Sequence, residues 1–194
     1  TDFRRIKEQV GKIREGIDNK VSKTVEDINL FSDNITKLNK EIVRLENAGG
    51  HANDLRDQRD QLVRNIAESF VVHTYEDKKG QFVVNVQGVG TLVTGGITNK
   101  LKTSRSSGPE GAQGKGQVEI TLEGRPGKPV SKKFIKGSIQ ALLNTRDNEI
   151  QDLDSRLDQL AHGLVHSTNA IHRRGYANKS IPTDQNGNVI YDER

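Results

Sequence analysis

The sequence predicts a mainly α protein with a small β part (α+β), built as an elongated antiparallel helical bundle of two long helices and one shorter helix with a β-hairpin-rich insert. Two long segments carry apolar residues at every third or fourth position, which is the period of a helix. Between them the pattern changes to short β-forming runs separated by glycine-rich turns. Hydrophobic residues make up only 31% of the chain and aromatic residues 4%, so the core is expected to be thin.

The first long segment runs from Phe3 to Leu45. Its apolar residues are three or four positions apart throughout, at Phe3, Ile6, Val10, Ile13, Ile17, Val21, Val25, Ile28, Phe31, Ile35, Leu38, Ile42 and Leu45. At about 1.5 Å per residue this helix would be roughly 65 Å long, so the molecule is expected to be elongated. One stripe of this kind needs a partner helix to bury it.

A shorter second helix is predicted from about Asp54 to Glu68. The glycine pair Gly49-Gly50 is placed to end the first helix, and Asn53 is expected to be the N-cap of the second. The two helices should be antiparallel. The charged residues of the second helix are expected to form a solvated face held by weak i,i+4 ion pairs.

The segment after the second helix has the pattern of strands. Residues 70–75 and 81–86 are predicted to pair as a hairpin, and further short strands are predicted at 91–93, 117–122 and 130–135. The stretch from Ser104 to Gly116 is rich in glycine and serine, so a flexible loop is expected there.

The second long helix is predicted to begin with Ser138 as its N-cap and to end with Gly175 as its C-cap. Its apolar stripe would supply the partner of the first. The predicted bundle core comprises one set of residues from all three helices: Ile28, Ile35, Leu38, Ile42, Leu62, Ile66, Leu143, Ile150, Leu153, Leu157, Leu160 and Leu164.

These patterns divide the chain into four parts. Residues 1–69 hold the long helix and the antiparallel second helix, 70–136 the β-rich insert, and 137–176 the returning helix that completes the bundle. Residues 177–194 form a turn-rich tail, where Asn186-Gly187 suggests another hairpin, leading to a truncated or variable outer region.

Cysteine is absent, which excludes disulfides, thiol catalysis and cysteine metal sites. Methionine is also absent, and a chain that starts at Thr1 inside a helical pattern is expected to be a fragment of a longer protein. No apolar run reaches the roughly 18 residues of a membrane span, and no signal peptide is visible.

Motifs for cofactors, metals and catalysis are each incomplete. Gly88-Val89-Gly90 lacks the third glycine of a dinucleotide fingerprint, and Gly114-Lys115-Gly116 lacks the Ser or Thr of a phosphate loop. His162 and His166 lie one helical turn apart without an obvious third metal ligand. The turn after Asp184 fits a hairpin better than a calcium loop. We therefore predict no catalytic, cofactor-binding or metal-binding residue, and no enzyme.

The basic charge is concentrated between Lys100 and Lys136. This segment holds nine Lys or Arg and three Glu, a net charge of +6, against +4 for the whole chain. A solvated sheet surface is the favoured interpretation, because aromatic side chains for stacking single-stranded bases are nearly missing there. The alternative function is a cytosolic coiled-coil module whose basic insert binds nucleic acid or an anionic membrane.

Three separated motifs occur in one order along the chain. The first is Asn53-Asp54-Leu55-Arg56-Asp57-Gln58-Arg59-Asp60, the second contains Arg146 and Asp147, and the third contains Asn169, His172, Gly175 and Tyr176. Together they resemble the family of bacterial flagellar hook-associated protein 1, the hook-filament junction protein. The resemblance covers roughly Phe3 to Tyr176.

The resemblance implies a rod domain like that of flagellin, in a structural subunit at the junction between hook and filament. It implies neither catalysis nor a cofactor. The implied partners are the hook protein, the second junction protein and copies of the subunit itself, with no nucleic acid and no membrane. Export through the flagellar type III pathway, without a cleaved signal peptide, would place the protein outside the cell.

The resemblance also implies that two functional segments of the family would be missing from this chain. The terminal helices that polymerise would be missing, and the export chaperone would bind a missing C-terminal segment. We therefore expect the chain to be a monomer in solution.

Overall fold

The computed structural model describes residues 2–78, 81–106, 116–124, 128–174 and 185–186. Helices dominate and the strands form two small antiparallel sheets, which confirms the predicted mainly α class with a small β part. The chain divides into two compact units, Thr1–Leu153 and Asp154–Arg194.

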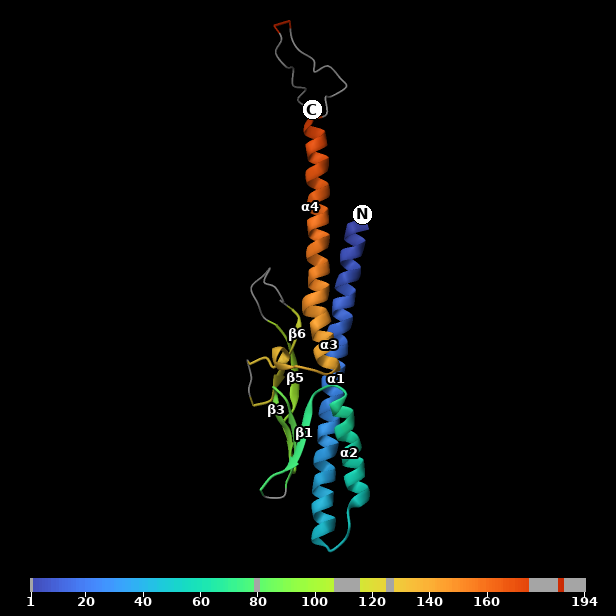
Figure 1. The fold of residues 1–194 in the computed structure, drawn as a ribbon, viewed down its shortest axis with the longest axis vertical. Helices are drawn as coiled ribbons and strands as arrows, with labels where there is room; N and C mark the ends of the chain where they lie inside the picture. Colours follow the sequence, from blue (N-terminus) through green and yellow to red (C-terminus); the bar gives the residue numbers. More distant parts are fainter. Residues whose placement is uncertain (1, 79–80, 107–115, 125–127, 175–184, 187–194) are drawn as a thin grey trace. The chain divides into compact units, whose positions relative to one another are not determined.

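Figure 1 labels the elements in chain order. The helices are α1 (Asp2–Asn47), α2 (Asn53–Ala67), α3 (Ser138–Asn144) and α4 (Ile150–Arg174), with a 3-10 turn η1 (Ser131–Lys133) and a π-helical turn η2 (Thr145–Glu149). The strands are β1 (Val72–Glu76), β2 (Phe82–Val86), β3 (Gly90–Thr94), β4 (Ile97–Thr98), β5 (Leu101–Arg105) and β6 (Val118–Leu122).

The first helix, α1, is unbroken over 46 residues, as its apolar stripe predicts. It ends where Gly49 takes a φ of 82°, a conformation that glycine adopts at little cost. α2 then runs back beside the C-terminal half of α1 (Figure 1). The N-cap prediction is wrong, because Asn53 is the first helical residue and Ala52 precedes it without a capping bond. Ala52 is buried, so this position contributes packing in place of a hydrogen bond.

The predicted hairpin is confirmed. β1 and β2 pair antiparallel, from Val72 opposite Val86 to Glu76 opposite Phe82. β3 and β4 complete a four-stranded sheet in the order β1-β2-β3-β4, and β5 pairs with β6 in a second sheet. The strand predicted at 91–93 therefore lies within β3, and the strand predicted at 117–122 includes all of β6 and the residue before it, whereas β4 and β5 were not predicted.

The strand predicted at 130–135 is wrong, because this segment forms the turn η1. The Val130 N–H donates to the Ile120 carbonyl at 2.7 Å, and the Ile120 N–H donates to Ser131 Oγ at 2.8 Å. A side chain thus takes the place of a ladder partner, and the chain turns away. The predicted loop from Ser104 begins within β5, and its residues 107–115 lie outside the described part of the chain.

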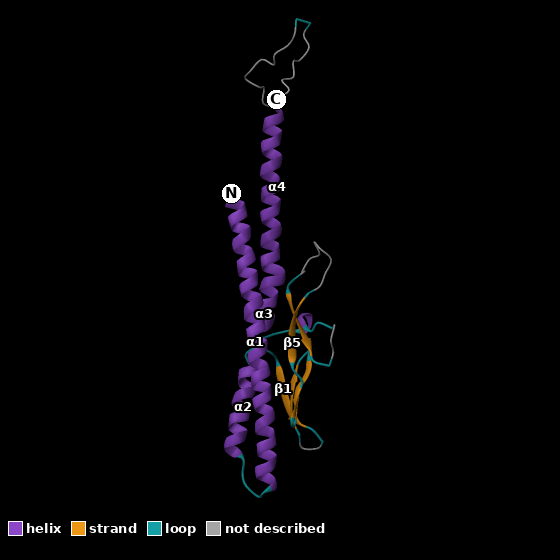
Figure 2. Ribbon diagram, turned by 180° about the vertical axis from the view of Figure 1, so that it is seen from behind, coloured by secondary structure: helices purple, strands orange, loops and turns teal. Residues whose placement is uncertain are grey.

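One hydrophobic core joins α1, α2 and α3 to both sheets. In both overall views α1 lies between α2 and the strands (Figures 1 and 2). The core residues come from every layer, including Val21, Val25, Ile28, Ile35, Ile66, Phe70, Val84, Leu92, Ile120, Ile139 and Leu143. The core is therefore broader than the predicted helical set, because the apolar inner faces of the strands are buried on the stripe of α1.

The returning helix begins at a corner made by Gly137. Gly137 has a φ of 103° and lies against the carbonyl of Ser69, where any Cβ would collide. The prediction of Ser138 as N-cap is wrong, since Gly137 occupies that position and Ser138 is already helical. The run from α3 continues through η2 into α4. The predicted C-cap at Gly175 and the hairpin near Asn186 fall on or next to residues outside the described part.

The predicted core residues differ in burial. Seven are buried: Ile28, Ile35, Ile42, Ile66, Leu143, Ile150 and Leu157. Leu38 and Leu62 are half-buried. Leu153, Leu160 and Leu164 are 46%, 59% and 52% exposed, so their assignment to the core is wrong. Beyond Leu157, what is described of the second unit is almost entirely one helix, and one helix cannot bury its own stripe, which explains the exposure of Leu160 and Leu164.

Candidate functional site

The first signature motif forms the N-terminal half of α2, and two of its residues reach inward. Asn53, Asp54, Asp57, Gln58 and Asp60 are exposed and Leu55 is half-buried. Arg56 is half-buried, and Arg59 is only 6% exposed. The expectation of a fully solvated charged face is therefore wrong for both arginines.

Arg59 is buried between α2, α1 and the first sheet. Its guanidinium carbon lies 3.7 Å from the ring centroid of Phe82, a cation–π contact. Its Nη1 donates to Asn39 Oδ1 at 3.2 Å. Burial lowers the pKa of Arg59 from its ordinary value, although the nearby charge of Asp60 acts in the opposite direction.

Asn39 connects this arginine to the sheet. While its oxygen accepts from Arg59, its Nδ2 donates to the Gly95 carbonyl at 2.8 Å. One amide thereby satisfies groups on α2 and on the β3–β4 turn. Sequence reasoning missed both Asn39 and Phe82.

Arg56 closes the outer side of the same region. Its Nη2 donates to both carboxylate oxygens of Glu46, at 2.8 and 3.0 Å, and its Nη1 lies 3.7 Å from Glu76. The hydrogen bonds to Glu46 are the main reason that the pKa of Arg56 is raised. Arg56 thus links the end of α1 and the end of β1 to α2.

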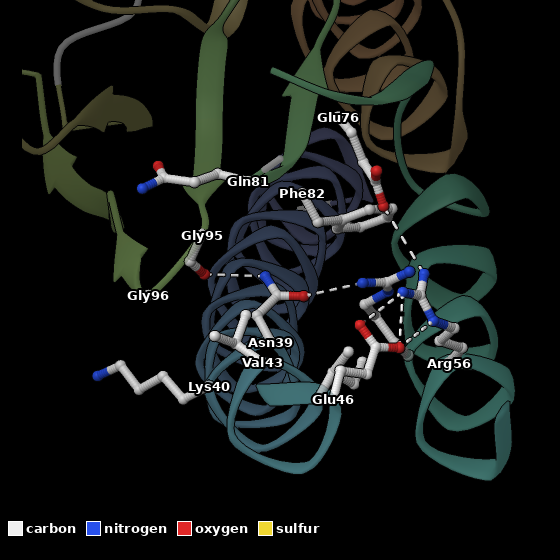
Figure 3. Close-up of a pocket in the computed structure, with 12 residues that line it drawn as sticks. Asn39, Lys40, Val43, Glu46, Arg56, Glu76, Gln81, Phe82, Gly95 and Gly96 are labelled. Carbon is white, nitrogen blue, oxygen red and sulfur yellow. Dashed lines mark hydrogen bonds and ion pairs between the residues drawn. The ribbon is translucent and has the colours of Figure 1, made fainter. Parts of the chain in front are cut away.

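A cavity of about 410 Å³ opens among these side chains (Figure 3). Its lining comes from α1, α2, β1, β2 with the residue before it, and the β3–β4 turn: Asn39, Lys40, Ile42, Val43, Glu46, Arg56, Arg59, Glu76, Gln81, Phe82, Gly95 and Gly96. In Figure 3, Asn39 lies between Gly95 and the side chains of α2. This cavity is a concave site within the first unit.

The second motif contributes a buried ionic cluster. Arg146, 2% exposed in the turn η2, donates from Nη1 to Asp18 Oδ1 at 2.6 Å and to the Val118 carbonyl at 2.7 Å. Its Nε and Nη2 donate to the carboxylate of Asp147 at 2.6 and 3.0 Å. Asp18 also accepts from the Val118 N–H at 3.4 Å. The cluster joins α1, β6 and the returning helix.

Two effects oppose each other on Arg146. Burial, the largest single effect, lowers its pKa, but the hydrogen bonds and charges of Asp147 and Asp18 together raise it above the ordinary value. The arginine therefore stays charged, and its buried charge is fully paired.

Polar residues of α1 also hold the sheets along the helix. Asn29 exchanges two hydrogen bonds with the backbone of Leu101, at 2.8 and 2.9 Å. Thr36 and Thr98 hydroxyls lie 2.7 Å apart. Asn29, Thr36 and Asn39 follow each other at helical spacing beside the apolar stripe, and this second stripe was the signal that sequence reasoning passed over.

The third motif belongs to the second unit. Asn169 and His172 are exposed on α4, and Gly175 and Tyr176 lie outside the described residues. His162 and His166 are exposed on the same helix. Among the described residues no group of His, Cys, Asp and Glu could hold a metal ion. None of the described helices is long and apolar enough to cross a membrane.

Comparison with known proteins points to one family. Residues 1–188 match the family model of the flagellar hook-associated protein FlgK helical domain. The chain is 29% identical over 159 residues to flagellar hook-associated protein 1 of Salmonella typhimurium. It is 26% identical over 160 residues to flagellar hook-associated protein 1 of Escherichia coli. Each match covers 80% of this chain and 28% of the relative, so the chain spans about 28% of the relatives' length.

A solved structure has a similar fold. It is described as the flagellar hook junction protein FlgK from Burkholderia pseudomallei, with a TM-score of 0.56 and 24% sequence identity. The match covers 72% of this chain and 25% of that chain. At this identity the likeness concerns the fold.

Proposed function

This chain belongs to the flagellar hook-associated protein FlgK helical domain family, and from that premise we propose that it is part of a structural subunit of the bacterial flagellum. The subunit forms the junction between hook and filament and acts through packing against other subunits, without catalysis. The observation that carries this proposal is the family match over residues 1–188.

The polar contacts between α1, the sheets and the returning helix support a structural role. Polar side chains of α1 clamp the sheets at Asn29, Thr36 and Asn39, and the Arg146 cluster clamps the returning helix to α1 and β6. Hydrogen bonds distributed along α1 hold both sheets against this helix. A subunit that transmits force needs elements held rigidly in this way. The guanidinium of Arg146 is hydrogen-bonded entirely within the chain.

The partners we propose are the hook protein, the second junction protein and further copies of the subunit. Export through the flagellar type III pathway, with a chaperone that binds another part of the full-length protein, would bring the subunit to the outside of the cell. These proposals concern the whole protein. The part that matches this chain is about 28% of the relatives' length.

The basic segment does not favour the nucleic-acid or membrane alternative. Lys100 forms an ion pair with Asp33 at 3.0 Å, and Lys102 forms one with Glu123 at 2.9 Å. These two lysines are therefore balanced by carboxylates within the fold.

Deletion of the full-length gene tests the proposed function. We expect hooks to form without attached filaments, and expression of the intact gene to restore filaments and swimming. Electron microscopy of the cells measures this. Normal filaments on the deletion strain would contradict the proposal.

For the isolated chain we propose a monomer, because the core of the first unit takes up the apolar stripe of α2 and much of that of α1. Exposed apolar side chains such as Leu160, Leu164 and Ile171 are the kind of residue that could drive association. Light scattering coupled to size-exclusion chromatography measures the mass, and a stable dimer at micromolar concentration would contradict this proposal.

A further inference from the structure

Both carboxylates that line the cavity in Figure 3 are paired with Arg56. Glu46 accepts hydrogen bonds from Arg56, and Glu76 forms an ion pair with Arg56 at 3.7 Å. The lining contains three basic side chains, Lys40, Arg56 and Arg59, and only these two acids, which leaves a net charge of +1.

Arg59 is therefore short of an acceptor. Its Nη1 bonds the neutral amide of Asn39, and its Nε is buried without any hydrogen-bond partner. Asp60 Oδ1 lies 3.9 Å from that Nε, which is beyond hydrogen-bond distance. A buried guanidinium that has a carboxylate nearby but none hydrogen-bonded to it is costly, and this contrasts with Arg146, which donates to two carboxylates.

The rest of the lining is apolar. Ile42, Val43 and the ring of Phe82 face the same space, and Val43 is 54% exposed, so the cavity is open to a group arriving from outside. A short aliphatic stem that ends in a carboxylate matches both parts of this lining: the stem fits the apolar wall, and the carboxylate can accept from the guanidinium groups.

We propose that this cavity is a docking site for an acidic side chain, a Glu or an Asp, on the surface of a neighbouring protein subunit. The carboxylate supplies the acceptor that Arg59 lacks and neutralises the lining. That the neighbour is a subunit of the same axial structure rests on the proposed function; the carboxylate chemistry does not.

The chemistry is tested on the chain itself by NMR. The probes are N-acetyl-glutamate amide and its neutral isostere N-acetyl-glutamine amide. We expect saturable shifts of the Arg59 Nε–H and the Gly95 amide resonances with the glutamate probe and none with the glutamine probe. Absence of shifts with the first probe, or equal shifts with both, would overturn the proposal.

A matched pair of variants locates the site. Val43→Glu places a carboxylate of the chain itself in the cavity, so the shifts caused by the glutamate probe should disappear, whereas Val43→Gln, of the same size, should retain them. Because the inserted carboxylate can pair with Arg59, Val43→Glu should also have a higher urea midpoint than Val43→Gln. Equal binding by the two variants would place the binding elsewhere and overturn the assignment.

The same pair in the full-length protein tests the source of the occupant. Cells that carry Val43→Glu should lose attached filaments more often than cells that carry Val43→Gln. Equal attachment, with the NMR result positive, would show that the cavity binds carboxylates but not those of an axial neighbour, and would overturn the docking role. Failure of the proposed function appears separately, as filaments on the deletion strain.

Discussion

Arg59 and Arg146 are both buried, yet their charges are accommodated in different ways. Arg146 has two carboxylates and a carbonyl within 3.0 Å. Arg59 has the face of Phe82, one amide oxygen, and a carboxylate oxygen of Asp60 that lies 3.9 Å from its Nε. A paired buried charge holds elements together and is costly to break, whereas an incompletely paired one retains affinity for an incoming anion.

The strength of the Arg146 cluster can be measured through Asp18. Asp18→Asn leaves the shape of the side chain but removes the charge that pairs with Arg146, so we expect a loss of about 3 kcal/mol in the free energy of unfolding. Urea unfolding followed by circular dichroism measures this loss.

Asp33→Asn is the matched control, since it is the same change on the same helix. Its partner Lys100 is 3.0 Å away and both side chains are partly exposed, so the expected loss is below about 1 kcal/mol. Equal losses for the two variants would show that the Arg146 cluster contributes no more than a surface ion pair.

Among the elements, the returning helix depends on the corner that precedes it and the π-helical turn within it. Gly137 lets the chain pass against the backbone of Ser69, and the Ser138 N–H donates to the Glu68 carbonyl at 3.2 Å. The turn η2 then carries Arg146 to Asp18 and Val118. The apolar spacing predicted one uniform helix. That spacing indicates neither the turn at Gly137 nor the π-helical turn η2.

Two glycine substitutions should therefore have opposite effects. Gly137→Ala puts a Cβ into the carbonyl of Ser69 at a φ of 103°, so we expect the free energy of unfolding to fall by at least about 2 kcal/mol. Gly11→Ala lies inside α1 with nothing within 4 Å of the new Cβ, so we expect a gain of about 0.5–1 kcal/mol. Thermal unfolding of both variants measures this, and destabilisation by Gly11→Ala would contradict the account of α1.

At the scale of the whole molecule, the main core belongs to the first unit. All of its residues precede Ile150, and they link α1, α2, α3 and both sheets. The second unit adds exposed apolar side chains such as Leu160, Leu164 and Ile171. Folding of the first unit should therefore be cooperative and independent of the residues after it.

A truncated chain of residues 1–153 should confirm this. We expect one cooperative urea transition with a midpoint close to that of the full chain, because no member of the main core is removed. Loss of the cooperative transition would show that residues 154–194 are needed to fold the first unit.

The local elements could be read directly from residue patterns. The unbroken α1, the turn at Gly49, and the β1–β2 hairpin were predicted, because helices and hairpins are held by hydrogen bonds between residues close in the sequence. The prediction of a strand at 130–135 was wrong because the Ile120 N–H donates to the Ser131 hydroxyl and not to a neighbouring strand.

The tertiary structure decided which faces are buried and which charges are paired. Arg59 has the pattern of a solvated helix residue, and its position is internal because Phe82 from a strand and Asn39 from α1 contact it. Leu160 has the pattern of a core residue, and it is exposed. Periodicity shows that a helix has an apolar or a charged side, but burial depends on surfaces contributed by distant parts of the chain, and no local pattern contains them.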